Sequence, residues 1–300
     1  MITQLLAWQP IHVILGLSLT IGSSTHLLAQ TYSVGSEVTI EADIVYGHKD
    51  GLAMTFDQYK PAVSSHRGAI LFMVSGGWFS KWAPPEQQLG FFKPFLDAEF
   101  TVFAIRHGSS PKYTIPEAVS DVRTAVRYIR HHAEHLKIDP NRLGVMGMSA
   151  GGHLALMLGT TGTDGKQNAS RVEEQSSRVA AVVALVPPTD LRVAVWDSPE
   201  SLPAYRQFPA LDLDLTLAAE NSPLLHVTSD DAPALVVMGE KDTLVPPKHG
   251  EWIQEAFVDK GTLSKLLILP EAGHGLEGPG NQATAFRESL AWFNRFLAEQ

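Results

Sequence analysis

One serine lies in a pattern that is typical of a nucleophile. Residues 147–151 read Gly-Met-Ser-Ala-Gly, which matches G-x-S-x-G with Ser149 at its centre. A strand-like apolar run ends at Met148, and a helix-like pattern begins at Ala150. In that context the small flanking residues allow a sharp turn that presents the serine hydroxyl at the edge of a sheet. A structural Gly-Ser-Gly turn is the alternative, and the strand–turn–helix context favours the nucleophile.

A serine hydroxyl needs a base that takes its proton, and the last third of the chain contains the candidates. Asp242 and His274 each follow a strand-like apolar run, and glycines flank His274 on both sides. The order serine, acid, histidine is the one found with this type of turn. Asp190 also follows a strand-like run and is the rival acid, but order and strand-end position favour Asp242. We therefore predict a catalytic triad of Ser149, Asp242 and His274.

The charge that develops on a reacting carbonyl oxygen needs fixed hydrogen-bond donors. One candidate is the backbone N–H of Ala150, directly after the nucleophile. The loop after the apolar run 69–74 reads Ser75-Gly76-Gly77-Trp78, and its glycines permit a close approach of the backbone to a ligand. We predict Gly76 and Gly77 as the other donors of an oxyanion hole. An ordinary glycine turn is the alternative interpretation of this loop.

The elements that must position these residues alternate along the chain. Two β-rich runs, 38–45 and 52–59, flank a turn and predict an antiparallel pair. Continuous apolar runs predict strands that are buried on both faces, at 69–74, 101–105, 143–148, 179–186, 234–238 and 265–269. Helical periodicity is found at 116–136, 150–158 and 284–297. This alternation predicts an α/β fold with a mainly parallel sheet that helices cover on both faces.

The connection at 187–232 is too long for a simple turn and helix. A long segment of this kind within one domain usually has a role near the site, so we expect a cap or a pocket wall. A helix pair that packs at the edge of the sheet is the alternative. Aromatic residues here and near the glycine loop could line a substrate pocket or belong to the core. The candidates for substrate binding are Trp78, Trp82 and Trp196, and Tyr205 and Phe208 are further aromatic residues of the long connection.

Composition excludes several classes of function. The 300 residues are 44% hydrophobic and 18% charged, as in a globular domain. The net charge of −9 is spread along the chain, and no basic patch could recruit nucleic acid. The chain has no cysteine, so disulfides, thiolate metal sites and a cysteine nucleophile are excluded. His131, His132 and His135 lack the ligand spacing of a zinc site, and we expect no metal.

The first residues differ in character from the rest. Residues 1–30 contain no Asp, Glu, Lys or Arg, and 11–21 are nearly all apolar. That run is shorter than the about 20 residues that span a bilayer. It predicts a signal peptide over 1–29 and a domain over 30–300 that is secreted or periplasmic, with no stable membrane insertion after cleavage. Because no basic residue starts the segment, an uncleaved interfacial anchor and an overlong start remain as alternatives.

Together these segments resemble the α/β-hydrolase superfamily, and most of all its esterase and lipase group. That group includes hormone-sensitive-lipase-like enzymes and bacterial feruloyl or acetylxylan esterases. The resemblance runs from about Ile40 to the end, and its specific parts are 147–151, 76–78, 239–242 and 273–275. It implies an eight-stranded core, the Ser–Asp–His triad and cofactor-free hydrolysis of a small-molecule or polymer ester through an acyl-enzyme. The sequence makes no prediction of oligomeric state.

One departure from the group concerns the glycine loop. The usual His-Gly-Gly-Gly motif is replaced by residues 75–78, Ser-Gly-Gly-Trp, so the histidine that normally braces the loop is absent. Two other functions stay open. A serine peptidase of the prolyl-oligopeptidase type would use the same triad. A non-catalytic binding protein could use the same scaffold, because fold does not determine function.

Overall fold

The computed structural model describes residues 30–34 and 37–298. The predicted signal peptide, residues 1–29, lies outside the described residues. Among the residues described, no helix combines the length and the apolar character that a membrane span requires.

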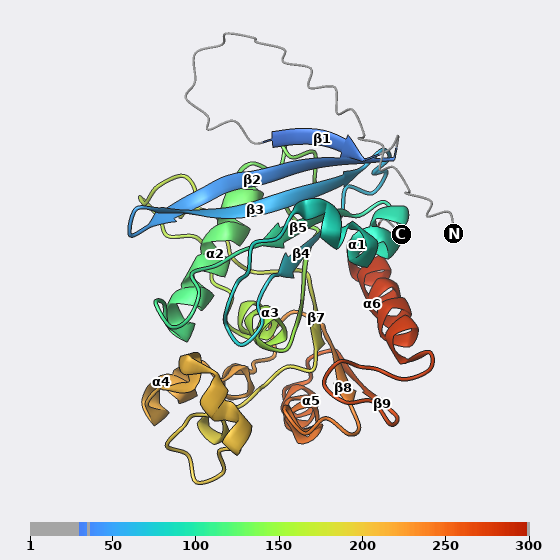
Figure 1. Cartoon of the computed structure of the whole chain (residues 1–300). Helices are drawn as coiled ribbons and strands as arrows, with labels where there is room; N and C mark the ends of the chain where they lie inside the picture. Colours follow the sequence, from blue (N-terminus) through green and yellow to red (C-terminus); the bar gives the residue numbers. More distant parts are fainter. Residues whose placement is uncertain (1–29, 35–36, 299–300) are drawn as a thin grey trace, which may run out of the picture.

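The described chain forms a nine-stranded sheet in the order β1-β2-β3-β5-β4-β6-β7-β8-β9 (Figure 1). Strands β4 to β9 are parallel, and β1, β2 and β3 form an antiparallel extension at one side. Strands β2 to β9 are the eight that we expected, and β1 adds an edge strand. The bounds are β1 Gln30–Val34, β2 Val38–Lys49, β3 Leu52–Pro61, β4 Ala69–Met73, β5 Thr101–Ile105, β6 Leu143–Met148, β7 Ala181–Leu185, β8 Ala234–Gly239 and β9 Ser264–Leu269.

Helices cover both faces of the sheet, and the sheet separates two apolar clusters of the core (Figure 1). Residues of α2, α3 and α5 pack in one apolar cluster, and residues of α1 and α6 pack in the other. The central strands β5, β7 and β8 are buried at every position, as their continuous apolar runs predict. The bounds are α1 Leu89–Asp97, α2 Ile115–His131, α3 Ala150–Thr161, α4 Leu215–Glu220, α5 Lys248–Lys260 and α6 Asn281–Leu297.

Helix α2 ends earlier than its periodicity predicts. The Thr114 amide donates to the Glu117 carboxylate at 2.9 Å, so the start is capped as a sequence of this type allows. The helix ends at His131, and the chain turns through Lys137 with φ 59°. Leu136 and Ile138 are buried in that turn, which explains why the apolar spacing continues beyond the helix.

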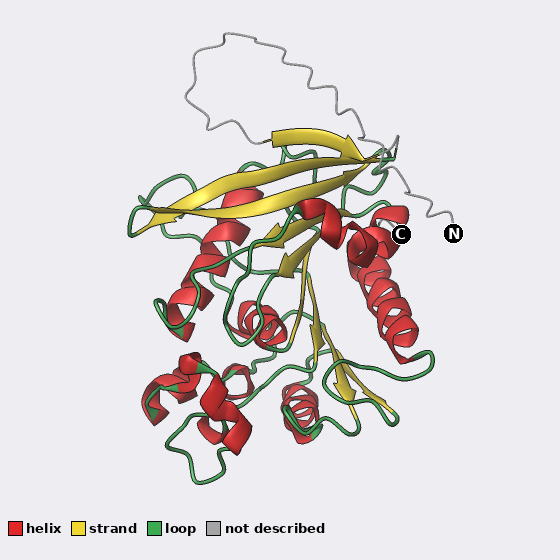
Figure 2. Ribbon diagram, in the orientation of Figure 1, coloured by secondary structure: helices red, strands yellow, loops and turns green. Residues whose placement is uncertain are grey.

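The long connection between β7 and β8 folds into short helical turns rather than a helix pair (Figure 2). Apart from α4 these are 3-10 turns, and three of them begin with proline, which favours a first helical turn. The segment lies beyond the carboxyl end of the sheet, next to α3 (Figure 1). The 3-10 turns are Leu191–Val193, Pro203–Gln207, Pro209–Leu211 and Pro223–His226.

Candidate active site

Ser149 occupies a strained turn between β6 and α3. Its backbone has φ 55° and ψ −121°, and holding a non-glycine residue there costs on the order of 1–3 kcal/mol. The Ser149 amide donates to the Leu185 carbonyl at 2.8 Å, which ties the turn to β7. A Cβ on Gly147 would lie 2.3 Å from the Gly151 backbone, and one on Gly151 would lie 2.5 Å from the Met73 carbonyl oxygen. Only glycine fits at both flanks, as the motif predicts.

Three side chains from the ends of three strands form one hydrogen-bonded chain. The Ser149 hydroxyl lies 2.9 Å from His274 Nε2, and His274 Nδ1 lies 2.7 Å from Asp242 Oδ2. Because a carboxylate only accepts, Nδ1 carries the proton and Nε2 is left to accept from the serine. The Asp242 side chain is 0% exposed, and its Oδ1 accepts from the amides of Leu244 and Val245, each at 2.9 Å. The structure thus brings together the three residues that the sequence singles out.

The rival acid lies elsewhere. Asp190 caps the first 3-10 turn of the long connection, where Oδ1 accepts from the Arg192 amide at 3.0 Å. Its Oδ2 is paired with the Arg192 guanidinium at 2.7 Å. This carboxylate is therefore engaged in capping and ion pairing, and Asp242 is the one that contacts the histidine.

Two buried histidines near the site are structural. His153 Nδ1 accepts from the Trp78 indole at 3.2 Å, and Nε2 donates to the Asn221 carbonyl at 2.7 Å. His249 Nδ1 accepts from the Thr189 amide at 3.1 Å. Burial lowers the pKa of His153 to about 4, and burial likewise lowers the pKa of His249 to about 4. Both rings are therefore neutral packing groups near neutral pH.

The glycine loop after β4 lies against the nucleophile turn. The Gly151 amide donates to the Ser75 carbonyl at 3.3 Å, which joins the two segments. Ala150 is the first residue of α3, so its N–H has no acceptor within the helix. The Gly77 amide, at φ 55°, makes no backbone bond among those found in the described residues. Gly77 and Ala150 therefore remain our predicted oxyanion donors.

The structure contradicts the prediction that the Gly76 amide is an oxyanion donor. Its amide donates to the Phe79 carbonyl at 3.0 Å, and the Phe79 amide donates back to the Gly76 carbonyl at 3.0 Å. These paired bonds close a tight turn, so the Gly76 N–H is already used. A run of two glycines indicates close approach of the backbone but does not show which amide the turn consumes.

A histidine from the neighbouring strand braces the glycine loop. His107 follows β5, and its Nδ1 donates to the Gly108 carbonyl at 2.8 Å. Its Nε2 is then an acceptor and receives the Ser75 hydroxyl at 2.8 Å. The bracing histidine that is missing from the motif is thus replaced in space by His107. Sequence reasoning missed this role, although a histidine at the end of an adjacent strand was a usable signal.

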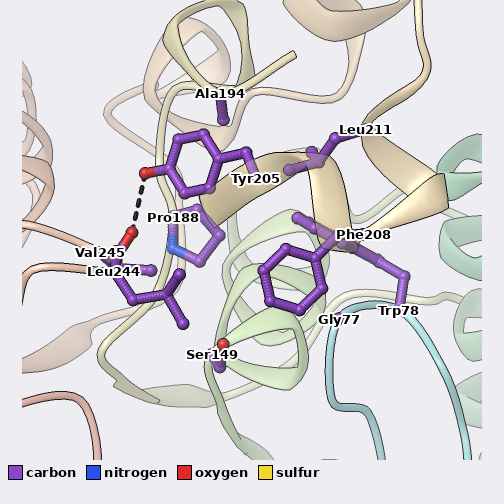
Figure 3. Close-up of a pocket in the computed structure, with 10 residues that line it drawn as sticks. All are labelled: Gly77, Trp78, Ser149, Pro188, Ala194, Tyr205, Phe208, Leu211, Leu244 and Val245. Atoms are coloured by element: carbon purple, nitrogen blue, oxygen red, sulfur yellow. Dashed lines mark hydrogen bonds between the residues drawn. The ribbon is translucent and has the colours of Figure 1, made fainter. Parts of the chain in front are cut away.

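A small pocket opens beside the nucleophile and the glycine loop (Figure 3). The long connection between β7 and β8 forms much of its wall. Burial raises the pKa of Tyr205 to about 12, with a further contribution from the nearby Asp242 charge, so the phenol stays protonated and donates. The pocket is lined by Gly77, Trp78, Ser149, Pro188, Ala194, Tyr205, Phe208, Leu211, Leu244 and Val245.

Of the tryptophans predicted to bind substrate, only Trp78 lines this pocket. Trp82 is 55% exposed and donates its indole N–H to Asp43, so it belongs to the surface beside β2. Trp196 donates its indole N–H to the Tyr205 carbonyl at 3.0 Å and lies behind the wall. Neither Trp82 nor Trp196 lines this pocket, because an aromatic residue type does not show which way the ring points. The described residues contain no group of three or more metal-ligating side chains that could hold a metal ion.

Comparison with known proteins relates this site to several hydrolases. The probable carboxylic ester hydrolase LipM of Mycobacterium tuberculosis is 27% identical over 86% of this chain and 61% of its own length. An acylamino-acid-releasing enzyme of Arabidopsis thaliana is 26% identical over 64% of this chain and 25% of its own length. A solved structure of a truncated carbohydrate esterase from gut microbiota has a TM-score of 0.74 and 22% identity, covering 89% of this chain and 99% of that one.

The chain thus spans between 25% and 61% of the length of these two curated relatives. The structural likeness shows the α/β-hydrolase fold. Residues 56–257 match the BD-FAE family, and the matched range contains Ser149, Asp242 and every residue that lines the pocket. Because the match covers more than half of the chain, this protein belongs to the BD-FAE family within the α/β-hydrolase superfamily.

Proposed function

We propose that the protein is a serine carboxylic ester hydrolase that works through an acyl-enzyme. The observation that carries this proposal is the hydrogen-bonded chain from Ser149 through His274 to Asp242, beside the amides of Gly77 and Ala150. The ester hydrolase name of the LipM relative agrees with it. The substrate is a small-molecule or polymer ester.

The reaction follows from the geometry. Ser149 Oγ attacks the ester carbonyl carbon while its proton passes to His274 Nε2, and Asp242 stabilises the charged ring. The carbonyl oxygen becomes an oxyanion that accepts from the Gly77 and Ala150 amides. The bond to the alcohol oxygen then breaks, and that oxygen takes the proton from Nε2. Water attacks the acyl carbon and gives a proton to Nε2, which returns it to Ser149 Oγ as the carboxylic acid leaves.

The nucleophile is tested by Ser149→Ala. Hydrolysis of p-nitrophenyl acetate should fall by on the order of 10⁶ in kcat, because triad serines in comparable enzymes act as part of a unit. The wild-type chain should label stoichiometrically with a fluorophosphonate probe, and the variant should not. Ser120→Ala, at an exposed position of α2, is the matched control and should keep full activity. Wild-type rates in Ser149→Ala would end the proposal.

Two other functions predict different results in the same assays. The acylamino-acid-releasing relative favours a peptide amide as the second candidate substrate, and the triad is common to both reactions. Faster turnover of an acylated peptide than of p-nitrophenyl acetate would support it. A binding protein on this scaffold would hydrolyse neither substrate and would fail to label.

We also propose that residues 1–29 are a signal peptide and that the domain acts outside the cytoplasm. The uncharged, apolar start supports this proposal. N-terminal sequencing of the protein from its native host should find the chain beginning near Gln30 or Thr31. A mature product that begins at Met1 would contradict it.

A further inference from the structure

The pocket beside Ser149 lies where the acyl part of an ester must go, given the proposed function. Its lining includes Ser149 and Gly77 but, among the described residues, not His274. His274 Nε2 must protonate the leaving oxygen, so the alcohol part lies on the histidine side of Ser149. With the carbonyl oxygen held at Gly77 and Ala150, the remaining substituent of the carbonyl carbon points into the pocket.

The inner surface of this pocket is apolar. The Trp78 indole N–H is used by His153 at 3.2 Å, and the Tyr205 hydroxyl donates to the Leu244 carbonyl at 2.8 Å. The other lining side chains, apart from Ser149, are hydrocarbon. An acyl chain would therefore gain only apolar contacts there, and space alone would determine its length.

Only a small part of this pocket is enclosed. The enclosed part has a volume of about 20 Å³, whereas about 330 Å³ of space lies between the walls where the pocket opens to solvent. A short acyl group is covered by the enclosed part, and a longer chain has to extend toward the solvent or displace the wall.

One ring forms the part of the pocket wall next to the glycine loop. In Figure 3 the Phe208 ring lies close to Gly77, among the side chains around Ser149. A Cβ built on Gly77 would lie 2.5 Å and 2.8 Å from two carbons of this ring, so the ring packs directly on the predicted oxyanion donor. Only a residue without a side chain at position 77 leaves room for it.

The ring is held in place from both sides along the chain. The Phe208 amide donates to the Tyr205 carbonyl at 3.0 Å, and the Phe208 carbonyl accepts from the Leu211 amide at 3.0 Å. The Tyr205 hydroxyl anchors this turn to Leu244, whose own amide donates to the Asp242 carboxylate. The insertion is thus tied to the loop that carries the proposed catalytic acid, and these bonds hold the backbone of Phe208 beside the glycine loop.

We propose that Phe208 is the specificity-determining residue of this esterase and that it restricts the acyl group to a short chain. The proposal rests on the proposed ester hydrolysis and goes beyond it by assigning the acyl side, the substrate class and the limiting residue. Acetyl esters should react fastest, and each added methylene should lower the rate in the wild-type protein.

The test compares kcat/KM for p-nitrophenyl acetate, butyrate and hexanoate in the wild-type chain, Phe208→Ala and Phe208→Leu, with active sites counted by a fluorophosphonate. Burying one methylene strengthens binding about fourfold, so burying the two extra methylenes of butyrate should raise its kcat/KM roughly 16-fold relative to acetate. Phe208→Ala should therefore raise the butyrate-to-acetate ratio at least tenfold, and Phe208→Leu should raise it less. Leu215→Ala removes an exposed apolar side chain on α4 of the same insertion, and its ratio should match that of the wild type.

Several outcomes decide the matter. A wild-type protein that hydrolyses hexanoate as well as acetate would overturn the limit on acyl length while leaving ester hydrolysis intact. An unchanged ratio in a Phe208→Ala protein that still labels with the probe would show that another residue sets the limit. If Phe208→Ala does not fold, Phe208→Leu carries the same comparison with most of the apolar volume retained. A wild-type protein that hydrolyses no ester would instead refute the proposed function.

Discussion

Replacing the buried acid by its amide tests the hydrogen-bonded chain most sharply. In Asp242→Asn the side-chain oxygen can still accept from the Leu244 and Val245 amides, which bind Oδ1 at 2.9 Å in the native protein. The new NH₂ group then replaces Oδ2, which lies 2.7 Å from His274 Nδ1. Two donors cannot face each other, so the ring must carry its proton on Nε2. That proton faces the Ser149 hydroxyl, and the base can no longer accept.

The expected loss is large and specific. The corresponding change in serine proteases lowers kcat by about 10⁴, which is ~5.4 kcal/mol of barrier. We expect a similar fall for p-nitrophenyl acetate. The thermal unfolding temperature should change little, because the two backbone bonds remain and the side chain keeps its shape.

A matched variant of the rival acid makes this result decisive. Asp190→Asn keeps the capping oxygen but removes the ion pair with Arg192, and activity should stay within about threefold of the wild type, since this carboxylate binds Arg192 and not His274. Steady-state kinetics on both variants at equal active-site concentration is the measurement. An Asp242→Asn protein that retains a tenth of the activity, or an Asp190→Asn protein that loses as much, would refute the assignment of the acid.

Two further predictions concern the loop and the buried histidines. Gly77→Ala should lower kcat/KM by about 10²–10³, because the new Cβ would collide with the Phe208 ring and move a predicted oxyanion donor. Gly76→Ala has open space at Cβ, so its kcat/KM should stay near that of the wild type. Equal losses in both variants would contradict the conclusion that the Gly76 amide is not an oxyanion donor. His153 and His249 have pKa values of about 4 in the fold against 6.5 in the unfolded chain, so the unfolded chain binds more protons between these pH values and stability is lost as pH falls through that window. Each histidine should contribute on the order of 1.4 kcal/mol per pH unit, and urea midpoints that are equal at pH 7 and pH 5 would count against it.

Helix α1 shows why some elements escape prediction from sequence. It contains Pro94, which normally ends or kinks a helix, and its short length leaves little periodicity to detect. The helix nevertheless forms and buries Phe92 and Phe95 against the sheet. Tertiary burial outweighs local propensity here, and this gain depends on residues far away in the sequence.

The grouping of Ser149, Asp242 and His274 could be predicted because its determinants are local. Each residue lies in the turn after a strand, and in a parallel sheet the carboxyl ends of the strands meet at one edge. Glycines around Ser149 and His274 mark the tight turns at those ends. The sequence therefore predicted which serine, histidine and aspartate come together, together with the alternation of strands and helices that brings them there.

Only the tertiary structure decided what surrounds the triad. The Gly76 amide is consumed by a turn, His107 braces Ser75 from the next strand, and Phe208 folds back from the insertion onto Gly77. The strand-end position of His107 is a signal for a residue near the site, but no pattern shows which loop its ring contacts. The contacts of Gly76 and Phe208 have no such signal, because they depend on how loops pack after distant segments have come together. Short motifs at strand ends predict the reactive groups of this protein. The size of its proposed acyl pocket depends on contacts between loops that are far apart in the chain.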